Sequence, residues 1–213
     1  MGDQLFDRST VEFGRGISFF DAIYGFAITL LITNIDLPPA AAWGSVEDLL
    51  STGLLSQLFG FLLSFAVIAV FWRVNFRQMA GVPVMSQRLI TWNIVAAFFI
   101  ILIPFTTQGT SDPAAAGYSL PTVLYALNVA LASLAQTAVF LSASRHNLAG
   151  AAGLGKGVRP LLPHLAVPAV FLASIPVIAV AGPGPGRLVW ASLLILSPLA
   201  GRLSGGNQRS PAA

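Results

Sequence analysis

Six runs of apolar residues, separated by short polar connections, follow one another along the chain. A spanning helix needs about 20 mostly apolar residues. The expected spans are residues 17–37, 49–72, 89–107, 121–143, 160–181 and 187–203. We expect Pro163, Pro168 and Pro176 to bend the fifth span, because each removes a backbone donor and crowds the preceding turn. The pattern predicts one all-α integral membrane domain, residues 1–203, with six transmembrane helices, followed by a disordered tail at residues 204–213.

The composition agrees with a membrane domain and narrows its chemistry. Of 213 residues, 55% are hydrophobic and only 9% are charged, whereas a soluble domain carries about 25% charged residues. The absence of cysteine excludes disulfides, thiolate catalysis and cysteine-ligated metal sites. The sequence also contains no nucleophile–base–acid set, phosphate loop or metal cluster, so we expect neither an enzyme nor a cofactor. The basic residues are scattered, so the net charge of +3 does not indicate nucleic-acid binding.

Basic residues concentrate on one side of the expected spans. Those near span ends on that side are Arg8, Arg15, Arg73, Arg77, Arg88, Arg145, Lys156, Arg159, Arg202 and Arg209. The other side has only Arg187, and its first loop carries the acids Asp36, Glu47 and Asp48. Because cytoplasmic loops are enriched in Lys and Arg, we expect a multi-pass protein of the cell membrane with both termini in the cytoplasm.

The first span carries polar residues on one face. At about 100° per residue, its small and hydroxylated positions form one stripe: Ser18, Ala22, Gly25, Thr29, Thr33 and Asp36. Such a stripe most commonly permits close packing of helices. The alternative is that it lines a water-filled path through the membrane. Asp21 lies beside the stripe. A charge in hydrocarbon costs about 2.5–3.5 kcal/mol on insertion scales. Asp21 is therefore either a functional residue or a structural one that neighbouring side chains hold by hydrogen bonds.

Polar residues at a similar depth on three spans are candidate partners for this acid. Asp21 lies about one turn inside the cytoplasmic end of the first span, the second span ends near Trp72 and Asn75, and the third begins shortly before Asn93. We expect Asp21 to accept hydrogen bonds from this group or from Arg15, and to act mainly in folding and assembly.

The stretch "RGISFFDAIYGFAITLL" resembles a known family. It is similar to the first-helix motif of the prokaryotic relatives of the endolysosomal potassium channel called transmembrane protein 175. That motif is an Arg, three residues, then Phe-Ser-Asp, followed by a run close to "AIAITLL". Arg15, Phe19 and Asp21 match it. "SFAVIAVFW", "WNIVAAFFIILIPFTT" and "LYALNVALASL" resemble the family's next three helices, and the last two spans match only in length and character.

The chain departs from the family pattern at three positions. Phe20 replaces the motif Ser, and Asn75 stands where the second helix commonly has His. Phe20 lacks the hydroxyl of the motif Ser, and both changes are expected to alter the details of the family's hydrogen-bond network. Phe26 stands where Ile or Leu is usual. In the tetrameric pore that the resemblance implies, four Phe side chains would form a tighter ring than four Ile side chains.

The resemblance implies a homotetramer in which the first helix of each six-helix subunit lines a central pore. It implies leak-like, potassium-preferring cation conduction, with potassium as permeant ion and no carbonyl filter loop. By position, the constriction would comprise Phe26, Leu30 and Thr33, with Thr29 as the motif threonine. The pore face and the small stripe are neighbours around the helix and share the two threonines. Leu31 is expected to face lipid.

Two other classes remain open at the level of sequence. A secondary ion or proton-coupled transporter would show inverted repeats and paired broken helices, but the proline-rich fifth span has no matching partner. A passive scaffold would conduct no ions. His146 and His164 lack a second ligand at metal spacing, so we expect them to be a solvated loop residue and a helix-end residue.

Overall fold

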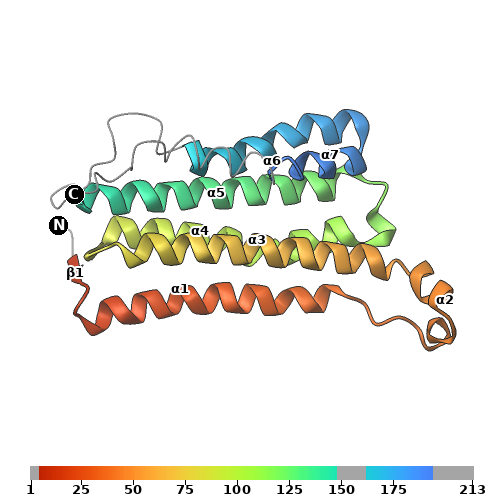
Figure 1. Cartoon of the computed structure of the whole chain (residues 1–213), viewed down its shortest axis with the longest axis horizontal. Helices are drawn as coiled ribbons and strands as arrows, with labels where there is room; N and C mark the ends of the chain where they lie inside the picture. The colour runs from red at the N-terminus through yellow and green to blue at the C-terminus, as the bar shows by residue number, and fades with distance from the viewer. Residues whose placement is uncertain (1–4, 148–161, 194–213) are drawn as a thin grey trace, which may run out of the picture.

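The structure, a computed structural model, describes residues 5–147 and 162–193 and forms an elongated helical bundle (Figure 1). Its helices are α1 (Val11–Leu30), α2 (Val46–Ser51), α3 (Leu54–Ala80), α4 (Gln87–Ser111), α5 (Ser119–Asn147), α6 (Leu162–Ala181) and α7 (Pro183–Trp190). Short 3-10 helices occupy Leu31–Asn34, Ala40–Gly44 and Pro113–Ala115. The strands β1 (Leu5–Asp7) and β2 (Val84–Ser86) pair antiparallel, with Leu5 opposite Ser86. Among these elements, five helices are long and apolar enough to cross a membrane, which makes this a multi-pass membrane protein.

These five helices correspond to the first five expected spans, but the second span is shifted. The sequence predicts a start at residue 49, whereas α3 begins at Leu54. The chain turns at Gly53, whose φ of +80° favours glycine. A Cβ at this glycine would also clash with Pro113, so a corner separates α2 from α3. At its other end α3 extends past residue 72 to Ala80. The sixth expected span, residues 187–203, overlaps α7; its remainder from residue 194 and the tail at 204–213 lie outside the described residues.

The N-terminal arm is attached to the connection between α3 and α4. The Arg8 guanidinium donates to the carbonyl oxygens of Ala80 at 2.6 Å and Val82 at 3.2 Å, where α3 ends. The guanidinium also lies 5.8 Å from the centre of the Phe13 ring. Since the last carbonyls of a helix lack intrahelical partners, Arg8 both caps α3 and fixes the start of α1.

The long helices form layers, with α1 on one flank and α6 and α7 on the opposite one (Figure 1). Helix α1 packs against α3 and α4, α4 packs extensively against α5, and α5 carries α6. The β1–β2 ladder, the end of α3 and the start of α4 lie at one end of the bundle, and α2 lies at the other (Figure 1). One broad face of α1 has no neighbour among the described residues of the subunit.

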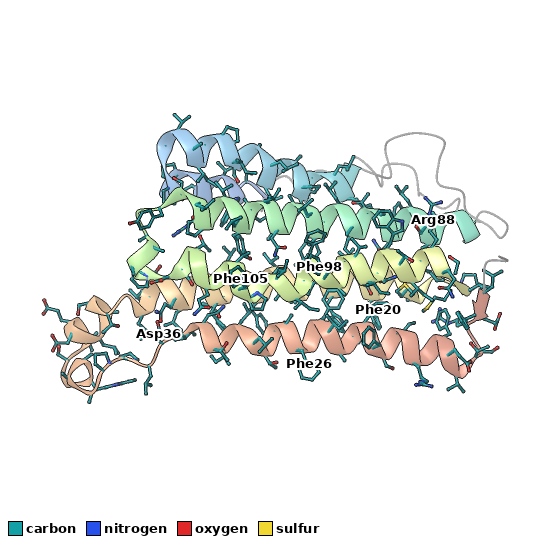
Figure 2. The ribbon with its side chains drawn as sticks, turned by 180° about the vertical axis from the view of Figure 1, so that it is seen from behind. Phe20, Phe26, Asp36, Arg88, Phe98 and Phe105 are labelled. Carbon is teal, nitrogen blue, oxygen red and sulfur yellow. The ribbon has the colours of Figure 1, made fainter. Side chains whose placement is uncertain are left out.

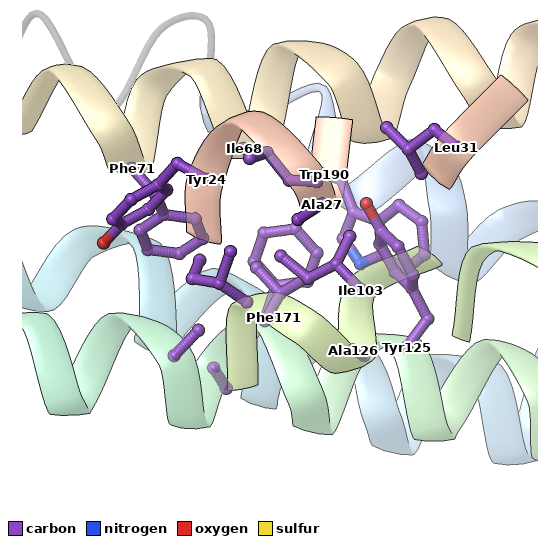
Figure 3. Packing of buried hydrophobic residues seen from close by; sticks show 14 of the residues in the cluster. Tyr24, Ala27, Leu31, Ile68, Phe71, Ile103, Tyr125, Ala126, Phe171 and Trp190 are labelled. Atoms are coloured by element: carbon purple, nitrogen blue, oxygen red, sulfur yellow. The ribbon is translucent and has the colours of Figure 1, made fainter. Parts of the chain in front are cut away.

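The core between these layers is rich in aromatic rings (Figure 3). Tyr24 and Leu31 of α1 and the following 3-10 turn are buried in it, with exposed fractions of 2% and 0%. Tyr125 of α5 stacks near Trp190 of α7, with ring centres 5.2 Å apart. The expectation that Leu31 faces lipid is therefore wrong. Leu31 follows Tyr24 and Ala27 on the same buried face, and the steps of three and four residues between them are those of an ordinary α-helix.

Candidate pore face and polar network

The exposed face of α1 carries the residues that the sequence assigns to the pore. Phe26 is 71% exposed and Leu30 is 48% exposed within the subunit. Figure 2 shows Phe26 directed away from the bundle, whereas Phe20 points into it. The small stripe is exposed as well: Ser18, Ala22, Gly25, Thr29, Thr33 and Asp36. Apolar and hydroxyl groups thus form a surface of α1 that the described helices do not cover.

The two threonines of this face orient their hydroxyls in the same way. Thr29 donates its hydroxyl hydrogen to the carbonyl oxygen of Phe26 at 2.9 Å, and Thr33 donates to that of Leu30 at 2.7 Å. Each hydrogen is therefore directed back along the helix. The oxygen lone pairs are left for groups outside the subunit. This arrangement suits contact with a cation or with a hydrogen-bond donor of another chain.

Asp21 is half-buried and has one of its expected partners. The indole nitrogen of Trp72 donates to a carboxylate oxygen of Asp21 at 2.9 Å. This bond joins α1 to α3. Arg15 is exposed and forms no hydrogen bond or ion pair with the described residues. Phe19 is 60% exposed and contacts Phe20 edge to face, with ring centres 5.6 Å apart.

The two expected asparagines do not reach Asp21 but bond to each other. Asn75 donates to the side-chain oxygen of Asn93 at 2.8 Å, which links α3 to α4. Asn93 donates in turn to the carbonyl oxygen of Leu89 at 3.0 Å. Both asparagines are buried, with 3% of their surfaces exposed. The two side chains pair with each other between α3 and α4, the helices against which α1 packs.

Gln136 of α5 completes this network, and the sequence analysis did not identify it. Its amide nitrogen donates to the hydroxyl oxygen of Tyr24 at 3.1 Å and to the carbonyl oxygen of Phe71 at 3.2 Å. Its amide oxygen accepts from Asn75 at 3.3 Å. One buried side chain thereby connects α1, α3 and α5. The sequence did contain a signal for this residue, because Gln136 is a polar side chain inside the fourth expected span, residues 121–143.

A second set of bonds holds the opposite end of α1. The Asn34 amide, in the 3-10 turn after α1, donates to the carbonyl oxygen of Pro104 at 2.7 Å. Gln57 forms a reciprocal pair with Asp36: it donates to the Asp36 carboxylate at 2.9 Å and accepts from the Asp36 backbone nitrogen at 3.0 Å. The pair ties the chain after α1 to the start of α3. Asp48, a second acid of this loop, bonds to Ser45, which caps α2.

The structure describes the side chain of one of the two histidines. His164 lies in the first turn of α6, and its ring stacks on Phe140 with centres 4.3 Å apart. His146 lies near the end of α5, where side chains are outside the description. Within the described residues no group of three potential metal ligands occurs.

Comparison with known proteins identifies relatives for the part of the chain that contains these sites. Residues 15–104 match the family described as endosomal/lysosomal potassium channel TMEM175. A potassium channel of Chamaesiphon minutus is 33% identical over 99 residues, 45% of this chain and 48% of the relative. One of Streptomyces collinus is 30% identical over 125 residues, 54% of this chain and 60% of the relative. A third, from a Chryseobacterium strain, is 21% identical over 126 residues, covering 58% and 61%.

The similarity in structure extends further than the similarity in sequence. The crystal structure of the lysosomal potassium-selective channel TMEM175 homologue from Chamaesiphon minutus superposes with a TM-score of 0.65. The superposition covers 92% of this chain and 97% of that chain at 22% identity. This agreement shows the fold. In sequence, the chain is similar to the TMEM175 family over residues 15–104 and to prokaryotic potassium channels over about half of their length.

Proposed function

We propose that this protein is a potassium-preferring, leak-like cation channel of the cell membrane. The observation that carries the proposal is the uncovered face of α1 with Phe26, Leu30 and two outward-facing threonine oxygens. Lipid covers exposed apolar side chains on other helices of the subunit, such as Phe59 and Phe105. The small and hydroxylated residues of the α1 face instead suit a neighbouring helix or water. The similarity in fold to a potassium-selective channel supports the interpretation that this face of α1 lines a pore.

Four copies of the chain would enclose the pore. One subunit offers a single α1, and one helix cannot surround a path. In a homotetramer, four α1 helices would face a central axis, and the small residues of the stripe would permit close approach. Each subunit would have six spans, the sixth at residues 187–203. Both termini would be cytoplasmic, on the side of the β1–β2 ladder.

Phe26 and Leu30 would form the narrowest part of this pore. Rings of apolar side chains gate by dewetting, and an ion must shed part of its hydration shell to pass. Potassium holds its water less tightly than sodium and would pass more easily, without the strong discrimination of a carbonyl filter. The lone pairs of Thr29 and Thr33 would then replace part of the lost hydration.

The buried network would hold α1 in the position that sets the pore width. Asp21, bonded to Trp72, anchors the half of α1 nearer the β1–β2 ladder, and Gln136 anchors Tyr24 one turn further along. Asn75 and Asn93 brace the helices behind it. In this proposal Arg15 and Phe19, which are exposed in the subunit, contact neighbouring copies or the membrane interface.

An ion-flux measurement on purified protein in liposomes tests the proposal. We expect potassium flux that exceeds sodium flux and rises linearly with driving force. Flux that saturates at low millimolar potassium would indicate a secondary transporter instead. No flux at all, from protein whose tetramers are intact by native mass spectrometry, would reject the channel.

A further inference from the structure

A cavity of about 390 Å³ lies among the ends of α3 and α5 and the start of α6, apart from the exposed face of α1. Its volume falls within the range of small-molecule sites. One charged and three polar side chains share its wall with apolar ones: Arg77, Gln78, Ser144 and His164, beside Val74 and Phe140. The pore proposal uses none of them.

Gln78 is the strongest sign that the cavity holds a ligand. Its side-chain nitrogen and oxygen are both buried, and neither has a hydrogen-bond partner among the described residues. Buried amides in proteins are almost always paired, so a fully unpaired one needs an explanation. An amide both donates and accepts, so the missing partner should offer an acceptor and a donor.

The charges around the cavity favour an anion. Arg77 is next to Gln78 in the last turns of α3 and forms no ion pair with the described residues. A guanidinium matches the geometry of phosphate oxygens. Ser144 donates its hydroxyl hydrogen to the carbonyl oxygen of Phe140 at 2.8 Å, and the His164 ring stacks on that phenyl ring. Both polar groups are therefore held in place beside the arginine.

The location of the cavity indicates where the anion comes from. Its lining residues belong to the last turns of α3 and α5 and to the first turn of α6, so it lies near the ends of three spanning helices. This is the depth at which lipid headgroups meet the hydrocarbon. Basic pockets between spanning helices on the cytoplasmic side of a membrane bind anionic headgroups. Val74 and Phe140 give the same cavity an apolar wall that suits the start of an acyl chain.

We propose that this cavity binds the phosphate headgroup of an anionic phospholipid. Arg77 donates to the phosphate oxygens, and the Gln78 amide nitrogen donates to a further one. The Gln78 amide oxygen accepts from a hydroxyl of the headgroup. The lipid thereby joins α3, α5 and α6. The site requires membrane insertion but does not rest on channel activity, and its test measures binding without ion flux.

The test follows the thermal unfolding midpoint of the purified full chain in detergent as phosphatidylglycerol is titrated. We expect this lipid to raise the midpoint, whereas phosphatidylcholine, glycerol 3-phosphate and inorganic phosphate do not. Arg77→Gln should raise the half-saturating lipid concentration about tenfold, the effect of losing one hydrogen bond to a charged group. The matched control is Arg73→Gln, an exposed arginine one turn earlier on α3 that does not line the cavity. It should leave the titration unchanged.

Gln78→Leu separates loss of the ligand from loss of the fold. Leucine is similar in size and removes the unpaired amide, so the lipid-free variant should unfold at or above the wild-type midpoint. Its lipid-dependent increase should nevertheless be lost. Equal lipid-dependent increases in wild type, Arg77→Gln and Gln78→Leu would overturn the proposal. Stabilisation by inorganic phosphate alone, or equally by phosphatidylcholine, would overturn the assignment to an anionic lipid.

Discussion

At the scale of single residues, Asp21 shows how a membrane helix accommodates an acid. Its carboxylate lies about one turn from the start of the predicted first span and accepts a hydrogen bond from the Trp72 indole. Trp is common at this depth, because its ring is apolar and its N–H is polar. The pair therefore satisfies both groups near the interface and fixes one contact between α1 and α3.

Removing the carboxylate should affect the fold before it affects ion preference. Asp21→Ala leaves the Trp72 N–H without its acceptor. Trp72 is 40% exposed in the subunit, so the expected cost is below the roughly 1–3 kcal/mol of a fully buried unpaired group. We expect a lower unfolding midpoint and less tetramer, with the potassium-to-sodium flux ratio of the remaining tetramer unchanged. Asp21→Asn keeps an acceptor and should retain most of the stability. If Asp21→Ala assembled fully and only the flux ratio changed, the acid would belong to the ion path.

At the scale of helices, the sequence predicted which segments span the membrane but not how they contact one another. Hydrophobic runs of the required length identify α1, α3, α4, α5 and α6 as candidate spans, because a helix that crosses the bilayer needs about 20 mostly apolar residues. The corner at Gly53 was missed because it depends on a close approach to Pro113, far away in the sequence.

Partners within the network were also only partly predictable. Asp21, Trp72, Asn75 and Asn93 have similar depths, and depth can be inferred from the sequence. The pairing of one with another depends on helix rotation, which tertiary packing sets. Gln136 escaped notice because it lies in the middle of an apolar run, without a neighbouring motif. The wrong assignment of Leu31 has another cause, because Leu31 follows Tyr24 and Ala27 on one buried face at α-helical spacing, and the sequence already contains that spacing.

Gln136 should be important for stability because it connects three helices. Gln136→Leu removes the group that donates to the Tyr24 hydroxyl oxygen. It also removes the second acceptor of the Asn75 amide nitrogen. We expect a loss of about 1–3 kcal/mol in the free energy of unfolding, measured by denaturant titration in detergent. Gln108→Leu is the matched control, since this glutamine of α4 is exposed. An equal loss in the two variants would mean that the bonds of Gln136 contribute nothing specific.

At the scale of the whole molecule, the orientation in the membrane decides which end of the proposed pore faces the cytoplasm. The chain contains no cysteine, so single-cysteine variants can be labelled from either side without background. We expect Glu47→Cys and Tyr118→Cys to react with a membrane-impermeant reagent outside intact cells. Pro83→Cys should react only after permeabilisation. All three side chains are exposed in the subunit. The reverse pattern would place the acidic loop in the cytoplasm.

The path of the ion is the other property that belongs to the assembled molecule. If four α1 helices enclose the pore, shortening the side chains at its narrowest level should widen it and make it wetter. Phe26→Ala and Leu30→Ala should therefore raise potassium conductance several-fold and reduce the preference for potassium over sodium, measured as flux into liposomes. Leu31→Ala is unsuitable as a control, because Leu31 is fully buried and truncation there would create a cavity in the core.

Val180→Ala is the better control for this experiment. Val180 is 90% exposed and lies on α6, on the flank opposite α1 (Figure 1). This variant changes an apolar surface of similar character without touching the proposed pore, so conductance and selectivity should stay at wild-type values. Suppose instead that Phe26→Ala and Leu30→Ala left both quantities unchanged while changes on α6 altered them. The ion path would then run through the other flank of the bundle, and the uncovered face of α1 would serve only to join the subunits.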